Sequence, residues 1–196
     1  MRKMWMMVVV LIFFGLGPAS LRAGTVPWSD GFEAGDFSAW SGSSGNWAVV
    51  TSGLSAHSGS RGADIIGATN PAGDPLLLQV SSVNVQDLQF SYWSKVRAGL
   101  EAEDLVSVEW SPDNVNWILL DTYTNILAGD WQFHSFNLPN TADNNPNLSF
   151  RLLAKLTSSG DRMNVDDFAL TVVPEPATLS LLALGMLAGV RRYRHG

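Results

Sequence analysis

The chain has 196 residues, of which 46% are hydrophobic and 15% are charged, and it contains no cysteine. This length fits one domain with extensions, the hydrophobic content is too high for a disordered chain, and the absence of cysteine excludes disulfides, thiol nucleophiles and Cys-based metal sites. Residues 24–173 hold 17 acidic and 6 basic residues, a net charge of −11, which argues against binding to nucleic acid.

The first 23 residues have the layout of a secretory signal peptide. Arg2 and Lys3 form a positive segment, and an apolar run follows over residues 5–17. That run is too short to span a bilayer comfortably as a helix. Cleavage is expected after Ala23, with cleavage after Ala19 as the alternative. We therefore expect residues 1–23 to form an export signal helix outside the fold.

Nine short segments after this signal are rich in β-forming residues. Hydrophobic side chains alternate in several of them, for example at Phe90 and Tyr92 and at Val106, Val108 and Trp110. Turn-forming residues separate the segments, and no helical period exceeds one turn. The predicted strands are residues 47–51, 63–66, 76–80, 88–96, 105–110, 117–123, 131–138, 148–156 and 168–172. Residues 24–172 are therefore predicted to form an all-β domain, an antiparallel β-sandwich of the jelly-roll type.

Several motifs occur in order along this body. Residues 30–40 read Asp-Gly-Phe-Glu-Ala-Gly-Asp-Phe-Ser-Ala-Trp, and residues 108–117 read Val-Glu-Trp-Ser-Pro-Asp-Asn-Val-Asn-Trp. Gly-Asp-Trp occupies residues 129–131, and Val-Asp-Asp-Phe occupies residues 165–168. Together they resemble MAM-like and carbohydrate-binding jelly rolls, which implies a concanavalin A-like or galactose-binding-like sandwich with a binding or adhesive role. Since the cysteines of animal MAM domains are missing, the adhesive partner of those domains is not implied.

Four acidic residues form a candidate metal site: Glu33 and Asp36 near the start of the body, and Asp166 and Asp167 near its end. In jelly rolls of this kind the first and last strands are neighbours, so these carboxylates could meet. The hydrophobic positions of the last strand are odd-numbered before the Asp pair and even-numbered after it, which predicts a bulge there. Calcium prefers six to eight oxygen ligands, and we expect a structural calcium ion at this place. The alternative is that all four are solvated turn residues.

Trp93 is the candidate ligand-binding residue. It has the opposite parity to Phe90 and Tyr92, so its ring is expected to point outward, where an indole can stack on the apolar face of a sugar. The other tryptophans of the body are expected to pack in the core; they are Trp28, Trp40, Trp47, Trp110, Trp117 and Trp131.

No catalytic residues are predicted. Glu101, Glu103 and Glu109 share parity, but they read as solvated rim residues rather than as the paired carboxylates of a glycosidase. His57 is expected to be an exposed loop residue, and neither it nor His134 accompanies a Gly-x-Ser-x-Gly or His-Glu-x-x-His motif.

The C-terminal segment has three ordered parts: a Val-Pro-Glu-Pro-Ala-Thr motif, an apolar run over residues 179–190, and an arginine cluster. A helix over residues 177–190 would be about 21 Å long, short of a hydrocarbon core of roughly 30 Å. Residues 173–196 resemble a PEP-CTERM sorting domain. The positions that carry this resemblance are Val173, Pro174, Glu175, Pro176, Ala177, Thr178, Arg191, Arg192 and Arg194.

That resemblance implies processing by a membrane-embedded exosortase in a Gram-negative bacterium that makes exopolysaccharide. The protein would be held briefly in the inner membrane and then delivered to the cell surface or extracellular matrix; a retained single-span anchor is the alternative. The sequence thus predicts an exported, non-catalytic protein that binds or organises exopolysaccharide. A purely structural or adhesive protein fits equally well, and a polysaccharide hydrolase or lyase fits less well.

Overall fold

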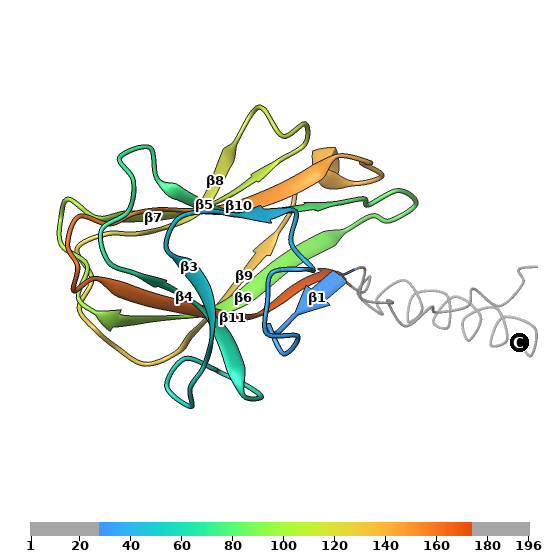
Figure 1. Cartoon of the computed structure of the whole chain (residues 1–196). Helices are drawn as coiled ribbons and strands as arrows, with labels where there is room; N and C mark the ends of the chain where they lie inside the picture. Colours follow the sequence, from blue (N-terminus) through green and yellow to red (C-terminus); the bar gives the residue numbers. More distant parts are fainter. Residues whose placement is uncertain (1–27, 174–196) are drawn as a thin grey trace, which may run out of the picture.

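The computed structural model describes residues 28–173, which form two antiparallel β-sheets packed face to face (Figure 1). In spatial order, sheet A contains β3 (Trp47–Thr51), β4 (Arg61–Ile66), β11 (Arg162–Val172), β6 (Leu88–Ala98) and β9 (Gln132–Asn137), and β1 (Trp28–Asp30) also pairs with β11. Sheet B contains β2 (Gly42–Ser43), β5 (Asp74–Val80), β10 (Leu148–Lys155), β7 (Leu105–Ser111) and β8 (Ile118–Tyr123). A single 3-10 turn, η1 (Asn140–Ala142), precedes β10. The predicted antiparallel sandwich is confirmed.

All nine predicted strands are present, and eight of them differ from the prediction by at most two residues at either end. β1 and β2 are only three and two residues long, so they carry no visible alternation and were not predicted. β11 begins at Arg162 rather than at the predicted Phe168. The prediction missed its first half because that half carries polar side chains, which are buried on the outer face of sheet A. β1 pairs with β11, so the first and last strands are neighbours as expected.

The two terminal segments lie outside the described residues, and so do the predicted signal helix and C-terminal helix. Within residues 28–173, no helix has the length and hydrophobicity needed to cross a bilayer.

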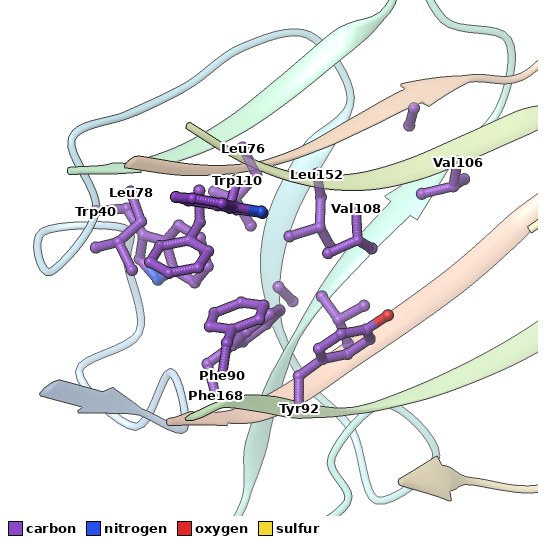
Figure 2. Close-up of a cluster of buried hydrophobic side chains, with 14 of the residues drawn as sticks. Trp40, Leu76, Leu78, Phe90, Tyr92, Val106, Val108, Trp110, Leu152 and Phe168 are labelled. Atoms are coloured by element: carbon purple, nitrogen blue, oxygen red, sulfur yellow. The ribbon is translucent and has the colours of Figure 1, made fainter. Parts of the chain in front are cut away.

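The core lies between the sheets and follows from the period-two pattern (Figure 2). Phe90 of β6 stacks on Phe150 of β10 with ring centroids 4.3 Å apart, which joins sheet A to sheet B. Trp110 of β7 and Phe168 of β11 are 1% exposed and complete this aromatic centre. Interdigitated rings of this size supply a large share of the apolar burial that stabilises a sandwich without disulfides.

The tryptophans divide between core and surface. Trp40, Trp47 and Trp110 are buried as predicted, and Trp28 packs against the core. The prediction was wrong for Trp117 and Trp131, which are half-buried and do not belong to the core. Each of them immediately precedes an edge strand, β8 or β9, where the sandwich offers no second layer to cover a large ring.

Candidate functional site

The last strand carries the predicted bulge at its two acidic residues. Pairing between β11 and β6 shifts register between Asp166 and Ala169, and Asp167 has a φ of 48°. Because a bulge re-aims the side chains around it, adjacent residues can approach the same point. A Cβ placed on Gly31 would lie 3.2 Å from Asp167 Oδ1 and 3.7 Å from Asp166 Oδ1. The two carboxylates therefore converge beside the end of β1.

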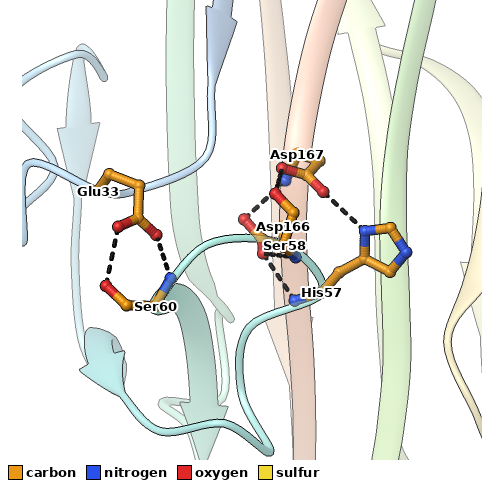
Figure 3. Close-up of polar contacts among 6 residues, drawn as sticks. All are labelled: Glu33, His57, Ser58, Ser60, Asp166 and Asp167. Atoms are coloured by element: carbon orange, nitrogen blue, oxygen red, sulfur yellow. Dashed lines mark hydrogen bonds and ion pairs between the residues drawn. The ribbon is translucent and has the colours of Figure 1, made fainter.

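The loop between β3 and β4 folds over this pair of carboxylates (Figure 3). The backbone N–H groups of His57 and Ser58 donate to Asp166 Oδ2 over 2.8 and 3.3 Å. His57 Nδ1 lies 2.7 Å from Asp167 Oδ2, and Ser58 Oγ donates to Asp167 Oδ1 over 2.6 Å. These contacts join residues that are more than 100 positions apart in the sequence. His57 is consequently half-buried, so its prediction as an exposed loop residue was wrong.

Glu33 and Asp36 lie apart from that pair. The Glu33 carboxylate accepts hydrogen bonds from Ser60 N, Ser60 Oγ and Arg61 N over 2.8, 2.9 and 2.9 Å, which lowers its pKa and fixes the end of the same loop. Asp36 is exposed and accepts only from Ser38 N within the described residues. The structure thus brings Asp166 and Asp167 together. Glu33, which follows β1, contacts the far end of the loop that covers them.

Asp166 is a buried carboxylate beside a second carboxylate. It is fully buried, and this burial raises its pKa to about 6 although three backbone N–H groups donate to its carboxylate. A buried carboxylate beside a second carboxylate is unfavourable without a positive charge nearby. Carboxylate oxygens are also the ligands that calcium prefers. The Asp166–Asp167 pair therefore offers the oxygen donors that calcium prefers, and hydrogen-bond partners from the covering loop and the backbone engage all four of its oxygens.

The structure also contains a second group of acidic residues that was not predicted from the sequence. Glu101, Asp104 and Asp161 place carboxylate oxygens within 4.8 Å of one another. A hydrogen bond to Asp104 and the charge of Asp161 raise the pKa of Glu101. Asp104 accepts from Glu101 N, Thr157 N and Thr157 Oγ1. Backbone and hydroxyl donors of two loops therefore already engage the Asp104 oxygens, and the group joins those loops.

Trp93 lies on the outer face of sheet A within a group of aromatic rings. His57 stacks on it with a centroid separation of 3.7 Å and an interplanar angle of 13°, and Phe133 of β9 lies 5.3 Å away. Trp131 packs edge-on against His57 at 5.6 Å. Phe133 is 55% exposed, so this aromatic patch of Trp93, Trp131, Phe133 and His57 reaches the surface.

The outer face of sheet B holds a second aromatic and polar group. The Arg151 guanidinium lies 4.1 Å from the centroid of the Trp117 ring and forms an ion pair of 2.6 Å with Glu109. Ser107 Oγ donates to the other Glu109 oxygen over 2.8 Å. The Glu109 side chain is only 15% exposed, so its prediction as a solvated rim residue was wrong. Glu109 is covered because the pairing of β7 with β10 places Arg151 directly opposite it.

The end of the chain matches a known sorting signal. A family model described as the PEP-CTERM protein-sorting motif matches residues 172–194. The chain carries a PEP-CTERM sorting motif. This match covers the Pro-Glu-Pro residues and the arginine cluster predicted from the sequence, and it begins at the last residue of β11. The motif therefore follows the sandwich directly.

The sandwich ahead of the PEP-CTERM motif is similar to solved modules. The K1 cleaved adhesin domain of Lys-gingipain from Porphyromonas gingivalis W83 aligns with a TM-score of 0.57 and 13% identity, over 74% of this chain and 98% of that one. TmCBM61, solved in complex with β-1,4-galactotriose, aligns with a TM-score of 0.54 and 19% identity, over 72% of this chain and 93% of that one. The CBM22-1 xylan-binding domain of Xyn10C from Paenibacillus barcinonensis aligns with a TM-score of 0.50 and 21% identity, over 79% of this chain and 98% of that one. At these identities the likeness establishes the fold. No curated protein matches the sequence.

Proposed function

We propose that this chain is an exported surface protein whose β-sandwich binds exopolysaccharide without cleaving it. The single observation that carries the proposal is the aromatic patch on sheet A, where Trp93 lies beside the exposed ring of Phe133 and Trp131 packs against His57. Aromatic rings offer an apolar surface to the C–H faces of sugars, and exposed apolar patches on soluble domains commonly mark binding sites. Modules of the same fold that are described as binding galactotriose and xylan agree with this role.

Binding rather than hydrolysis suits the carboxylates of the outer face of sheet B. Glycosidases use two carboxyl groups that face the scissile bond from opposite sides. Glu109 is instead held by Arg151 and Ser107. Both Glu109 oxygens are therefore already engaged by neighbours on the same face of the sheet.

The PEP-CTERM motif supports a proposed route to the surface. An exosortase would process the tail while the C-terminal segment holds the protein in the inner membrane. The sandwich would then be delivered to the cell surface or matrix of a Gram-negative bacterium. The alternative of a purely structural or adhesive surface protein shares this route but needs no glycan site.

Calcium is proposed as a structural ion held by Asp166 and Asp167. The other two predicted ligands, Glu33 and Asp36, lie apart from this pair, and Glu33 supports the covering loop through Ser60. An ion bound at the Asp pair would neutralise the buried Asp166 and fix the loop that carries His57. Because His57 stacks on Trp93, the ion would also hold the aromatic patch in place.

Replacing Trp93 by alanine is expected to weaken polysaccharide binding roughly 30-fold. Loss of a central aromatic contact at an interface costs about 2 kcal/mol, which corresponds to that factor. The measurement is co-sedimentation of the protein with the producing organism's exopolysaccharide in the presence of calcium. Trp117→Ala, on the outer face of sheet B, is the matched control and should bind like the unchanged protein.

Two other outcomes have distinct meanings. Loss of binding with Trp117→Ala alone would move the glycan surface to sheet B, where that ring meets Arg151. No co-sedimentation of the unchanged protein would reject polysaccharide binding and leave the structural or adhesive role.

A further inference from the structure

A pocket of about 320 Å³ opens between the two sheets on the side where edge strands β8 and β9 face each other. The connection over residues 124–131 crosses from one sheet to the other and closes the pocket at one end. It is fixed there by Gly129 N, which donates to Val96 O over 3.0 Å, and by the bridge between Leu100 and Ile126. The pocket is separate from the aromatic patch, because alternation along β9 turns His134 inward and Phe133 outward.

The floor of the pocket is a pre-formed polar network. His134 Nδ1 lies 3.0 Å from Asp121 Oδ2, and His134 Nε2 lies 2.9 Å from Ser94 Oγ and 3.1 Å from Tyr123 OH. The imidazole also stacks on Tyr92 at 4.9 Å, and Tyr92 OH donates to Asp121 over 3.1 Å. Because Tyr92 stacks on one face and partners engage both ring nitrogens, the imidazole has a fixed orientation, and such preorganisation favours ligand binding.

The order Ser94–His134–Asp121 resembles a hydrolytic triad, but its surroundings favour binding. Ser94 is 2% exposed, and its hydroxyl also lies 3.1 Å from Tyr123 OH, so it has little room to attack a substrate. Burial raises the pKa of Tyr123, which keeps the phenol neutral and able to share hydrogen bonds. The network therefore ties the two sheets together and presents a polar floor.

The rim and walls of the pocket combine hydrogen-bonding groups with an apolar surface. Asp130 and Gln132 line the pocket, and within residues 28–173 their side chains have no hydrogen-bond partner. Val96, Ile126 and Leu127 provide the apolar part of the lining. A sugar ring matches this combination, since its hydroxyl groups bond to polar atoms while its C–H face contacts apolar side chains.

The charge of the lining narrows the ligand class. Asp121 and Asp130 contribute carboxylates, whereas no lysine or arginine among residues 28–173 lines the pocket. Uronic acids, sulfated sugars and phosphates would be repelled at this short range. A volume near the lower end of small-molecule sites suits one or two sugar rings rather than an extended chain segment.

We propose that this pocket binds the terminal, non-acidic sugar residue of a glycan chain. The inference rests on the proposed polysaccharide binding and adds to it a chain-end site, distinct from the aromatic patch. The terminal sugar would lie against Ile126 and Leu127, with its hydroxyl groups bonded to Asp130 and Gln132.

The test uses the purified full chain in a detergent without a sugar headgroup. The probe is a complete acid hydrolysate of the producing organism's exopolysaccharide, which contains every monosaccharide of that polymer. Saturation-transfer difference NMR should show transfer to at least one neutral or amino sugar and none to uronic acids. The double variant Asp130→Ala/Gln132→Ala should weaken that binding at least 10-fold. The matched control Glu103→Ala/Gln79→Ala removes an exposed carboxylate and an exposed amide elsewhere and should bind normally.

Three results would overturn the chain-end site: no transfer to any non-acidic sugar, transfer to uronic acids alone, or transfer that the pocket variant does not reduce. Trp93→Ala separates this site from the proposed polysaccharide surface, because it should reduce co-sedimentation and leave the hydrolysate signal intact. If the polymer does not co-sediment but the hydrolysate signal depends on Asp130 and Gln132, the pocket stands and the polymer-binding surface fails.

Discussion

Arg162→Met is expected to destabilise the domain by about 3–5 kcal/mol, because it strands a buried charge. Asp64 on β4 is fully buried on the outer face of sheet A, and Arg162 on β11 contacts both of its carboxylate oxygens, with Nε 2.8 Å from Oδ2. Burial raises the pKa of Asp64, and the guanidinium opposes that effect. Urea unfolding at pH 7, followed by intrinsic tryptophan fluorescence, measures the change in the free energy of unfolding.

The pH dependence of this variant has a definite sign. Without Arg162 the folded-state pKa of Asp64 should rise further above its unfolded value. The favourable contribution of the protonated form is then present at low pH and is lost as the pH rises through the folded-state pKa. The defect should therefore be smaller at pH 4 than at pH 7. The double variant Asp64→Leu/Arg162→Met, which removes both charges, should recover most of the stability. If the free energy of unfolding of Arg162→Met lay within 1 kcal/mol of that of the unchanged protein, the importance of this ion pair would be contradicted.

Calcium removal is expected to lower the Tm by about 5–10 °C. An ion present at 100 times its Kd stabilises the folded state by about 2.7 kcal/mol, and 1 kcal/mol shifts the Tm of a domain of this size by about 2–4 °C. Melting curves in EDTA, and then with excess calcium, measure the loss and its reversal. Asp167→Ala should abolish the response. Asp36→Ala tests the other end of the predicted ligand set and should retain it, since Asp36 contacts only Ser38.

The response to calcium should also depend on pH. The pKa of Asp166 is raised to about 6 by burial, so below pH 6 a proton competes with the ion for this carboxylate. In EDTA the charged form of Asp166 costs stability as the pH rises through 6, and calcium should offset that cost. The shift in Tm is therefore expected to be larger at pH 7.5 than at pH 5. A Tm that EDTA leaves unchanged at pH 7.5 would reject the calcium site.

Local pattern was enough to predict the strands and their inward faces. Phe90 and Tyr92 lie on one face of β6 and Trp93 lies on the other. Burial of the first two in the core therefore required the Trp93 ring to point outward. The change of parity at Asp166 and Asp167 located the bulge, because one inserted residue reverses which positions face the core. β1 and β2 escaped detection because two or three residues cannot display a period of two.

The neighbours of the candidate site residues could not be predicted in the same way. His57 meets Asp167 across 110 positions only because the loop after β3 folds back over β11. Glu109 meets Arg151 because β7 and β10 pair in one particular register. The network around His134 needs two edge strands from different sheets. No local period encodes such contacts, since loop paths and strand order depend on the packing of the whole chain.

The sequence by itself therefore determined the antiparallel sandwich, the core positions of the alternating strands, the outward Trp93 and the C-terminal sorting motif. Each of these depends on neighbours within a few residues, through side-chain alternation, turn chemistry or a continuous motif. Only the tertiary structure decided what covers Trp93, which of the four predicted carboxylates converge, and where a pocket opens between the sheets. Those features arise from loops and strand edges distant in sequence, which the burial of the common core brings together.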